Sequence, residues 1–154
     1  AVDVSADALA AARAAGAEVT IDDTGLDPAS VATAVADATD GGAHASVDAI
    51  GGAGAAMASI LGLRRRGRHV QVGLMAGDAA RAPAAYDRII AWELDVLGSH
   101  GMAAARYPAM LDMVTSGSLD AAGRVTSTVT LSEAIDVLVD PDAAGPGICV
   151  IDRF

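Results

Sequence analysis

The first two-thirds of the chain alternate short apolar runs with segments whose apolar residues recur at helical spacing. This alternation predicts strand–helix–strand units with parallel strands, because each helix carries the chain back across the sheet before the next strand begins. Strands are expected at 1–4, 17–21, 45–50, 68–74 and 94–98. The predicted fold class is α/β, with an open, doubly wound parallel sheet.

Capping and breaking residues predict where the first two helices begin and end. Ser5 and the pair Asp27-Pro28 are typical helix starts, because a side-chain oxygen accepts a free N–H of the first turn and proline fits the first helical position. Gly16 and the pair Gly41-Gly42 predict the corresponding ends.

A third predicted helix carries Ala56, Ile60 and Leu63 on one face and is expected to end at Gly67. The only dense basic run, formed by Arg64, Arg65, Arg66 and Arg68, then lies at the end of this helix, where the helix dipole favours cations. We therefore expect these arginines to be structural rather than to form a phosphate or partner site. A short fourth helix is predicted at 86–92.

After residue 99 the pattern changes. The elements expected there are an amphipathic helix carrying Tyr107, Met110, Leu111 and Val114 and stopped by Gly117, an extended threonine-rich run at 125–129, a helix capped by Ser132 and ended by Asp140-Pro141, and a closing strand at 148–151. We place a domain boundary near residue 99, which divides the chain into 1–99 and 100–154.

Charge and composition exclude several classes of protein. The net charge of −10 disfavours nucleic acid as a partner, because phosphate binding needs clustered cations. No run of about eighteen apolar residues would span a membrane. The single cysteine, Cys149, excludes an internal disulfide and fits a reducing, cytoplasmic location.

Asp3 is the strongest candidate for binding a ligand. An acidic residue that ends the second strand of a dinucleotide-binding sheet accepts hydrogen bonds from the adenosine ribose, and its charge repels a 2′-phosphate. The glycine fingerprint that accompanies it should lie about twenty residues earlier, upstream of Ala1. The run Gly52-Ala53-Gly54 is not a substitute, because Met57 stands where a third glycine or an alanine should let helix and strand pack closely.

Each of the three histidines is a candidate acid, base or ligand. His44 is expected in a solvated turn, and His69 is expected as a boundary residue that opens a strand. His100 follows the fifth strand at its carboxyl end, where it could touch cofactor or substrate. Three histidines and Cys149, far apart in sequence, predict no metal site, and no nucleophile elbow is present.

Several segments occur in the order of one known family. They are Ala1-Val2-Asp3-Val4-Ser5 with Arg13-Ala14-Ala15-Gly16-Ala17, then Asp48-Ala49-Ile50-Gly51, 67–74, 94–99 and 131–134. At these separations they resemble the medium-chain dehydrogenase/reductase superfamily, zinc-dependent alcohol dehydrogenase type. The resemblance covers essentially the whole chain, and the order of the segments is far more specific than any one of them.

The resemblance implies that Asp3 binds the adenosine ribose of NAD rather than NADP. The chain departs from the family pattern at Ala6, where several relatives carry a lysine or arginine near the ribose. The other implied cofactor-binding residues are Ala49 and Ile50 along the path from adenosine to nicotinamide, Val72, Gly73 and Leu74 at the nicotinamide carboxamide, and Leu97, Gly98 and Ser99 on the nicotinamide side of the cleft.

The resemblance further implies that 1–99 are a partial Rossmann-type NAD-binding domain and that 100–154 are an α+β tail that rejoins a catalytic domain outside this sequence. Zinc, its ligands and the catalytic residues would then belong to the full-length parent only, and this segment would be inactive by itself. The implied substrate is an alcohol or carbonyl compound, and the implied assembly is a homodimer or homotetramer.

Two alternatives stay open at this point. One is a zinc-free quinone oxidoreductase of the same superfamily, which would use NADPH and carry a small or basic residue at position 3. Asp3 argues against it. The other is a non-catalytic binding module that uses the sheet as a scaffold, since a fold alone does not fix a function.

Overall fold

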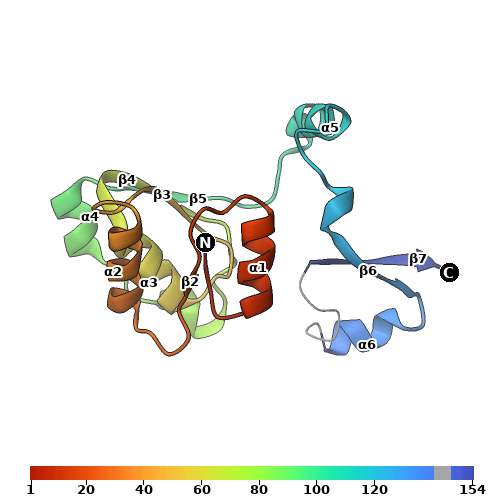
Figure 1. Cartoon of the computed structure of the whole chain (residues 1–154), viewed down its shortest axis with the longest axis horizontal. Coiled ribbons are helices and arrows are strands. Elements are labelled where there is room, and N and C mark those ends of the chain that lie inside the picture. The colour runs from red at the N-terminus through yellow and green to blue at the C-terminus, as the bar shows by residue number, and fades with distance from the viewer. Residues whose placement is uncertain (141–146) are drawn as a thin grey trace. The chain divides into compact units, whose positions relative to one another are not determined.

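Every strand pairing in the described residues is parallel, so the α/β prediction is confirmed (Figure 1). The structure is a computed structural model that describes residues 1–140 and 147–154. It divides into two compact units, Ala1–His100 and Gly101–Phe154.

The first unit holds two parallel sheets. In one, β1 (Val2–Asp3) pairs with β2 (Ile21–Asp22), and in the other the strand order is β3 (Ala43–Asp48), β4 (Leu63–Gln71) and β5 (Asp95–Gly98). Its helices are α1 (Ala6–Ala14), α2 (Pro28–Ala38), α3 (Ala53–Leu61), the 3-10 turn η1 (Gly77–Arg81) and α4 (Tyr86–Trp92).

The predicted helix starts are confirmed in atomic detail. The Ser5 hydroxyl accepts the N–H of Ala8 at 3.3 Å, and the Asp27 carboxylate accepts the N–H of Ser30 at 2.8 Å. Pro28 occupies the first turn of α2. Each bond satisfies a backbone donor that has no partner inside its own helix, so these residues fix where α1 and α2 begin.

The predicted end of the third helix is wrong. Helix α3 ends at Leu61, and Leu63, expected on the same helix, is instead the fully buried first residue of β4. The pairing runs from Ala43↔Leu63 directly to Ala45↔Arg68. The residues between therefore form a bulge in β4, and Gly67 lies inside a strand rather than at a helix end.

The arginine run is structural, although it lies in this bulge and not in a helix. Arg64 donates to His44 Nε2 at 2.7 Å, and Arg65 donates to the carbonyl oxygen of Ala91 at 3.2 Å. Arg66 has a left-handed backbone, with φ of 60°, and pairs with Glu93 at 3.0 Å. The cations thus tie β4 to the neighbouring segments.

A small core holds α3, β4 and α4 together. Ile60, Leu63 and Leu94 are buried in one cluster, against which Trp92 packs. The Arg88 guanidinium stacks on the Trp92 ring, 3.1 Å from its centroid, and donates to the carbonyl oxygen of Leu61 at 2.9 Å. Burial lowers the pKa of Arg88, and the nearby Arg65 charge lowers it further, while Asp87 opposes the shift.

The second unit contains the 3-10 turns η2 (Ala104–Arg106) and η3 (Ala122–Arg124), the helices α5 (Tyr107–Thr115) and α6 (Ala134–Val139), and the parallel pair β6 (Val125–Thr130) and β7 (Ile148–Arg153). Ser132 does not cap α6 as expected. Thr130 and Glu133 exchange hydrogen bonds instead, because the Glu133 carboxylate accepts the Thr130 N–H at 2.8 Å and the Thr130 hydroxyl accepts the Glu133 N–H. Pro141, expected to end this helix, lies outside the described residues.

None of the described helices is both long and apolar enough to cross a membrane.

We expect Leu63→Ala to lower the free energy of unfolding by about 2–5 kcal/mol, because it leaves a cavity at a fully buried position. Ile90→Ala on α4 is the matched control, since that side chain is 75% exposed and should change stability by no more than about 0.5 kcal/mol. Urea unfolding measures both. Equal midpoints for the two variants would contradict this packing.

Candidate functional site at the carboxyl ends of the strands

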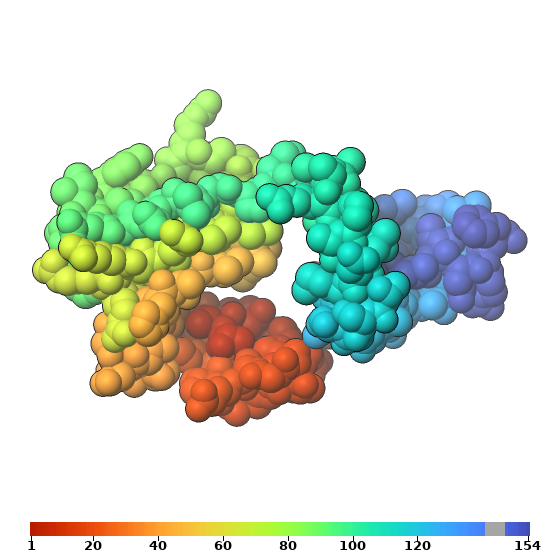
Figure 2. Space-filling view, turned by 90° about the horizontal axis from the view of Figure 1, so that it is seen from above, coloured from red at the N-terminus to blue at the C-terminus, as the bar shows by residue number. Residues whose placement is uncertain are grey.

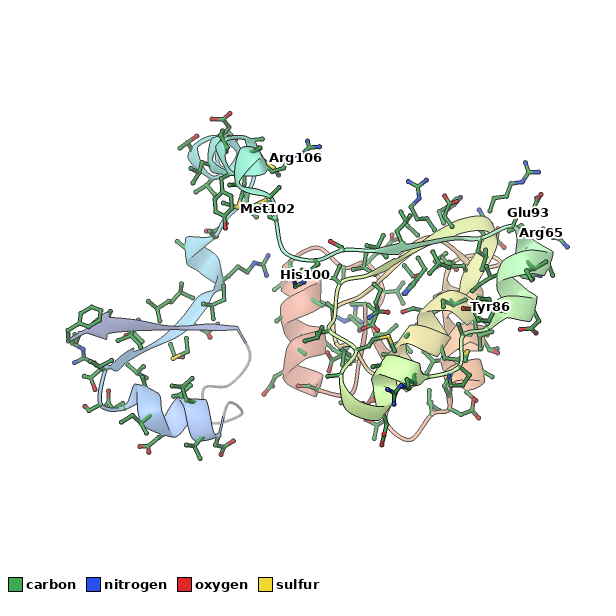
Figure 3. The ribbon with its side chains drawn as sticks, turned by 180° about the vertical axis from the view of Figure 1, so that it is seen from behind. Arg65, Tyr86, Glu93, His100, Met102 and Arg106 are labelled. Carbon is green, nitrogen blue, oxygen red and sulfur yellow. The ribbon has the colours of Figure 1, made fainter. Side chains whose placement is uncertain are left out.

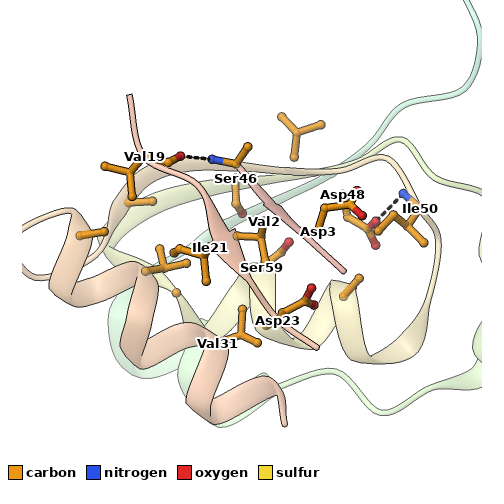
Figure 4. Close-up of a pocket in the computed structure, with 18 of the residues that line it drawn as sticks. Val2, Asp3, Val19, Ile21, Asp23, Val31, Ser46, Asp48, Ile50 and Ser59 are labelled. Carbon is orange, nitrogen blue, oxygen red and sulfur yellow. Dashed lines mark hydrogen bonds between the residues drawn. The ribbon is translucent and has the colours of Figure 1, made fainter. Parts of the chain in front are cut away.

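The strands of the first unit end at one common edge. β1 ends at Asp3, β3 at Asp48 and β4 at Gln71. Asp3 and Asp48 line the same cavity, and Figure 4 labels both among its lining residues. Ligands of open parallel sheets bind outside the carboxyl ends of the strands, so this edge is the candidate site.

Asp3 is held where β1 turns into α1. One carboxylate oxygen, Oδ1, accepts the N–H of Ser5 at 2.8 Å, while Oδ2 has no partner among the described residues. The side chain is partly exposed. The structure therefore fixes the carboxylate at the sheet edge and leaves one oxygen available to a ligand.

The turns after β3 and β4 are in direct backbone contact. The N–H groups of Val72 and Gly73 donate to the carbonyl oxygen of Asp48 at 2.9 and 2.8 Å. A Cβ built at Gly73 would overlap the backbone of Gly51 and lie 2.7 Å from the backbone nitrogen of Ile50. The structure thus brings the predicted residues Ala49 and Ile50 together with Val72, Gly73 and Leu74.

The end of β5 adjoins the end of β4. Gly98 is paired with Gln71, and the N–H of Ser99 donates to the carbonyl oxygen of Gln71 at 2.9 Å. This places Leu97, Gly98 and Ser99 beside the Val72–Leu74 turn. Figure 3 shows His100 just beyond β5, at the end of the strand opposite Glu93 and Arg65. His100 is exposed.

Large apolar side chains are exposed along this edge. Ile50 is 70% exposed, Leu74 is 78% exposed, and Val72 is about half exposed. Scattered exposed apolar residues are common, but these three belong to turns that touch each other. They form an apolar rim that a flat ring system could cover.

A cavity of about 710 Å³ separates β1 from β3. Its lining includes consecutive residues of both strands, 1–3 and 45–48, so it follows the strand edges rather than one face of a sheet. Figure 2 shows the red N-terminal residues of the first unit below its orange to yellow residues. Within the described chain, β1 pairs only with β2 and β3 only with β4, which leaves both edges along the cavity unpaired.

A chain of polar side chains lies beneath this edge, and the sequence pattern did not predict it. Asp48 and His69 are 3% and 1% exposed, and His69 lies inside β4 instead of opening a strand as predicted. Ser46 Oγ is 3.1 Å from His69 Nδ1, His69 Nε2 is 3.2 Å from Gln71 Oε1, and Gln71 Nε2 donates to Asp48 Oδ2 at 2.8 Å. His44 is exposed as expected, but it lies within β3 rather than in a turn.

The Asp48 carboxylate stays charged despite its burial. Burial alone would raise its pKa, but hydrogen bonds from the Gly51 N–H, the Gln71 amide and the Ile50 N–H, together with the His69 ring, outweigh that effect. The pKa of Asp48 therefore lies below its ordinary value of 3.8.

The described residues contain no group of three or more histidine, cysteine, aspartate or glutamate side chains that could hold a metal ion.

Comparison with models of protein families shows which family the chain belongs to. The model of the zinc-binding dehydrogenases matches residues 1–116. The chain belongs to the zinc-binding dehydrogenase family. Its resemblance to the medium-chain dehydrogenases is thereby confirmed. No curated protein gives a significant match.

Solved structures share the fold. An NAD-dependent alcohol dehydrogenase is 25% identical with a TM-score of 0.80, and the match covers 97% of this chain and 42% of that one. The alcohol dehydrogenase of the archaeon Aeropyrum pernix is 24% identical with a TM-score of 0.78, covering 96% and 40%. A short chain alcohol dehydrogenase from E. coli CFT073, complexed with NADH, is 16% identical with a TM-score of 0.80, covering 99% and 43%. This zinc-binding dehydrogenase chain thus spans about two-fifths of the length of the structures it matches.

We expect Gly73→Ala to lower the free energy of unfolding by about 1–3 kcal/mol, because its methyl group would push the turns after β3 and β4 apart. Gly98→Ala is the matched control at the end of the adjacent strand, since no atom lies within 4 Å of the added Cβ. Chemical unfolding compares the two. Equal loss of stability in both variants would show that the turns are not in contact.

Acid should weaken the fold in part through Asp48. Because its pKa is lower in the folded than in the unfolded chain, its stabilising contribution is complete above about pH 4 and is lost as the pH falls through the folded value. We expect the unfolding free energy of the wild type to fall more steeply in acid than that of Asp48→Asn. Urea midpoints from neutral pH down to about pH 3 measure this, with exposed Asp37→Asn as a control that keeps the wild-type slope. Parallel curves for Asp48→Asn and the wild type would contradict it.

Proposed function

We propose that these residues form the NAD-binding part of a zinc-dependent alcohol dehydrogenase, an oxidoreductase that transfers hydride between an alcohol and NAD. The observation that carries the proposal is the common edge. It combines a carboxylate at the end of β1 with the touching turns after β3 and β4, in a chain of the zinc-binding dehydrogenase family. One neighbour that is 25% identical is an NAD-dependent alcohol dehydrogenase.

The adenosine end of NAD would bind at Asp3. A carboxylate with a free oxygen can accept hydrogen bonds from the ribose hydroxyls, and its charge disfavours the 2′-phosphate of NADP. This supports NAD over the NADPH-dependent quinone oxidoreductase alternative.

The nicotinamide end would bind at the apolar rim. Ile50, Val72 and Leu74 offer apolar surface to the ring. The carbonyl oxygen of Val72 and the N–H of Leu74 have no hydrogen-bond partner among the described residues, so they can meet the two polar groups of a carboxamide. Bound there, NAD supplies the hydride chemistry, and the residues of this chain hold and orient it.

The pyrophosphate of NAD would need a binding element, a glycine turn and a helix N-terminus, that the described residues do not provide between β1 and β3. Dinucleotide-binding sheets of the classic order place a central strand, followed by a glycine turn and a helix N-terminus, between the strands that correspond to β1 and β3. The cavity along the two unpaired edges has the place and direction of that strand. We propose that the strand comes from sequence outside the 154 residues.

The rest of the enzyme would also lie outside this sequence. The described residues hold no set of zinc ligands, so zinc, the catalytic residues and most of the substrate pocket would come from another domain. In this proposal 1–99 bind the cofactor and 100–154 rejoin that domain. The exposed edge of β5, at Val96 and Leu97, pairs with no strand among the described residues and would join two subunits in a dimer or tetramer.

We expect the complete protein that carries these residues to bind NAD more tightly than NADP, and Asp3→Ala to weaken NAD binding roughly ten- to a hundredfold while leaving NADP binding nearly unchanged. Calorimetric titration of both cofactors tests this. Asp37→Ala, which removes an exposed charge from α2, is the control and should behave as the wild type. If neither cofactor binds the wild type, the chain serves as a scaffold and the dehydrogenase proposal is wrong.

A further inference from the structure

We infer that Gln71 and His69 are positioning residues, which hold the backbone turns that receive the nicotinamide through a directed chain of partly buried hydrogen bonds. The inference rests on the proposed function. Its basis is the row of polar side chains in which Ser46 faces His69 and Asp48 faces Gln71 across the β3–β4 pair. Residues two apart on a strand share a face, so the four side chains lie on one side of the sheet.

The orientation of the Gln71 amide is fixed by its neighbours. Its Nε2 lies 2.8 Å from a carboxylate oxygen of Asp48 and 2.9 Å from the carbonyl oxygen of Gly73. Both partners only accept hydrogen bonds, so the nitrogen must face them and use both of its protons. The reversed amide would place an oxygen against two oxygens.

The amide in turn fixes the protons of His69. Gln71 Oε1 can only accept, so His69 Nε2, at 3.2 Å, must carry the proton. In the neutral ring Nδ1 is then an acceptor, and the Ser46 hydroxyl at 3.1 Å donates to it. Every bond points the same way, from Ser46 through His69 and Gln71 to the Asp48 carboxylate.

The far end of this chain holds both turns. Asp48 Oδ1 accepts the N–H groups of Ile50 and Gly51 at 2.8 and 3.0 Å, which shapes the turn after β3. Asp48 Oδ2 and the Gly73 carbonyl oxygen share the Gln71 amide, which fixes the turn after β4. The partly buried Gln71 side chain thus sets the position of one turn relative to the other.

Loss of the Gln71 amide would leave three groups without their partners: Asp48 Oδ2 and the His69 N–H, which belong to buried side chains, and the Gly73 carbonyl oxygen. Unpaired polar groups are costly at low dielectric, so the turns would shift to find other partners. Small displacements at a reacting centre reduce rates strongly. Asp3 belongs to the β1–β2 sheet, and in the described structure it makes no hydrogen bond to Ser46, Asp48, His69 or Gln71. Binding of the adenosine half of NAD should therefore be preserved.

The test uses Gln71→Met in the complete protein, which keeps length and volume but removes the amide. NADH and ADP-ribose are the probes, because ADP-ribose lacks only the nicotinamide. We expect the Kd for NADH to rise about tenfold and kcat to fall, while the Kd for ADP-ribose stays within about twofold. Arg68→Met is the control, since Arg68 directly precedes His69 in β4 but points to the opposite face of the strand, where it forms an exposed ion pair with Asp95.

The outcomes separate the two proposals. If the wild type binds neither ligand, the proposed function fails. If the wild type binds both and Gln71→Met weakens both equally, or neither, the positioning role is overturned while NAD binding stands.

A second measurement needs no folded Gln71 variant. Nitrogen NMR of the histidine-labelled protein, with the signal assigned through its loss in His69→Gln, should show the His69 ring protonated at Nε2 and not at Nδ1. A ring protonated only at Nδ1 would reverse the chain of bonds and overturn the inference.

Discussion

The first unit depends on the contact between the turns after β3 and β4. Gly51 and Gly73 touch through their backbones, and no side chain fits between them. The Asp48 carbonyl oxygen accepts two N–H groups of the second turn, and its carboxylate accepts two of the first. Because of this contact the ends of three neighbouring strands form one surface, which the parallel topology places at the edge where cofactors bind.

Much of the fold follows from the sequence because local signals agree with the tertiary structure. Ser5 and Asp27-Pro28 mark helix starts through bonds that need only neighbouring residues. The prediction failed where local and tertiary signals conflict. Arg64 to Gly67 resemble a helix end, with cations before a glycine, yet burial of Leu63 against α4 draws the chain into a bulged strand. Before α6, Thr130 rather than Ser132 accepts the N–H of Glu133, and the Ser132 hydroxyl lies 3.0 Å from the Thr130 hydroxyl instead.

The position of the candidate site could be predicted from the sequence more readily than the hydrogen-bonded side chains beneath it. Alternating strands and helices put Asp3, Ile50 and Val72 at carboxyl ends, which the structure places along one edge. The polar chain was hidden because it depends on which residues of β3 and β4 lie opposite each other. The pairing of Ser46 with His69 follows a bulge that no sequence pattern revealed. Polar residues at every second position of two neighbouring strands, 46 and 48 with 69 and 71, were the available signal.

The two ends of the proposed cofactor site belong to different sheets, and the cavity lies between these sheets. Asp3 lies on the β1–β2 pair, whereas Gly73 follows the three-stranded sheet, and the two sheets share no strand hydrogen bonds. Val2 and Val47 remain exposed beside the unpaired edges between them. A strand in the cavity would pair both edges, cover these side chains and set the separation of the ribose carboxylate from the nicotinamide turns. In the proposed enzyme, completing the sheet and binding NAD would therefore be linked, because a ligand that contacts both ends favours the state in which their distance is fixed.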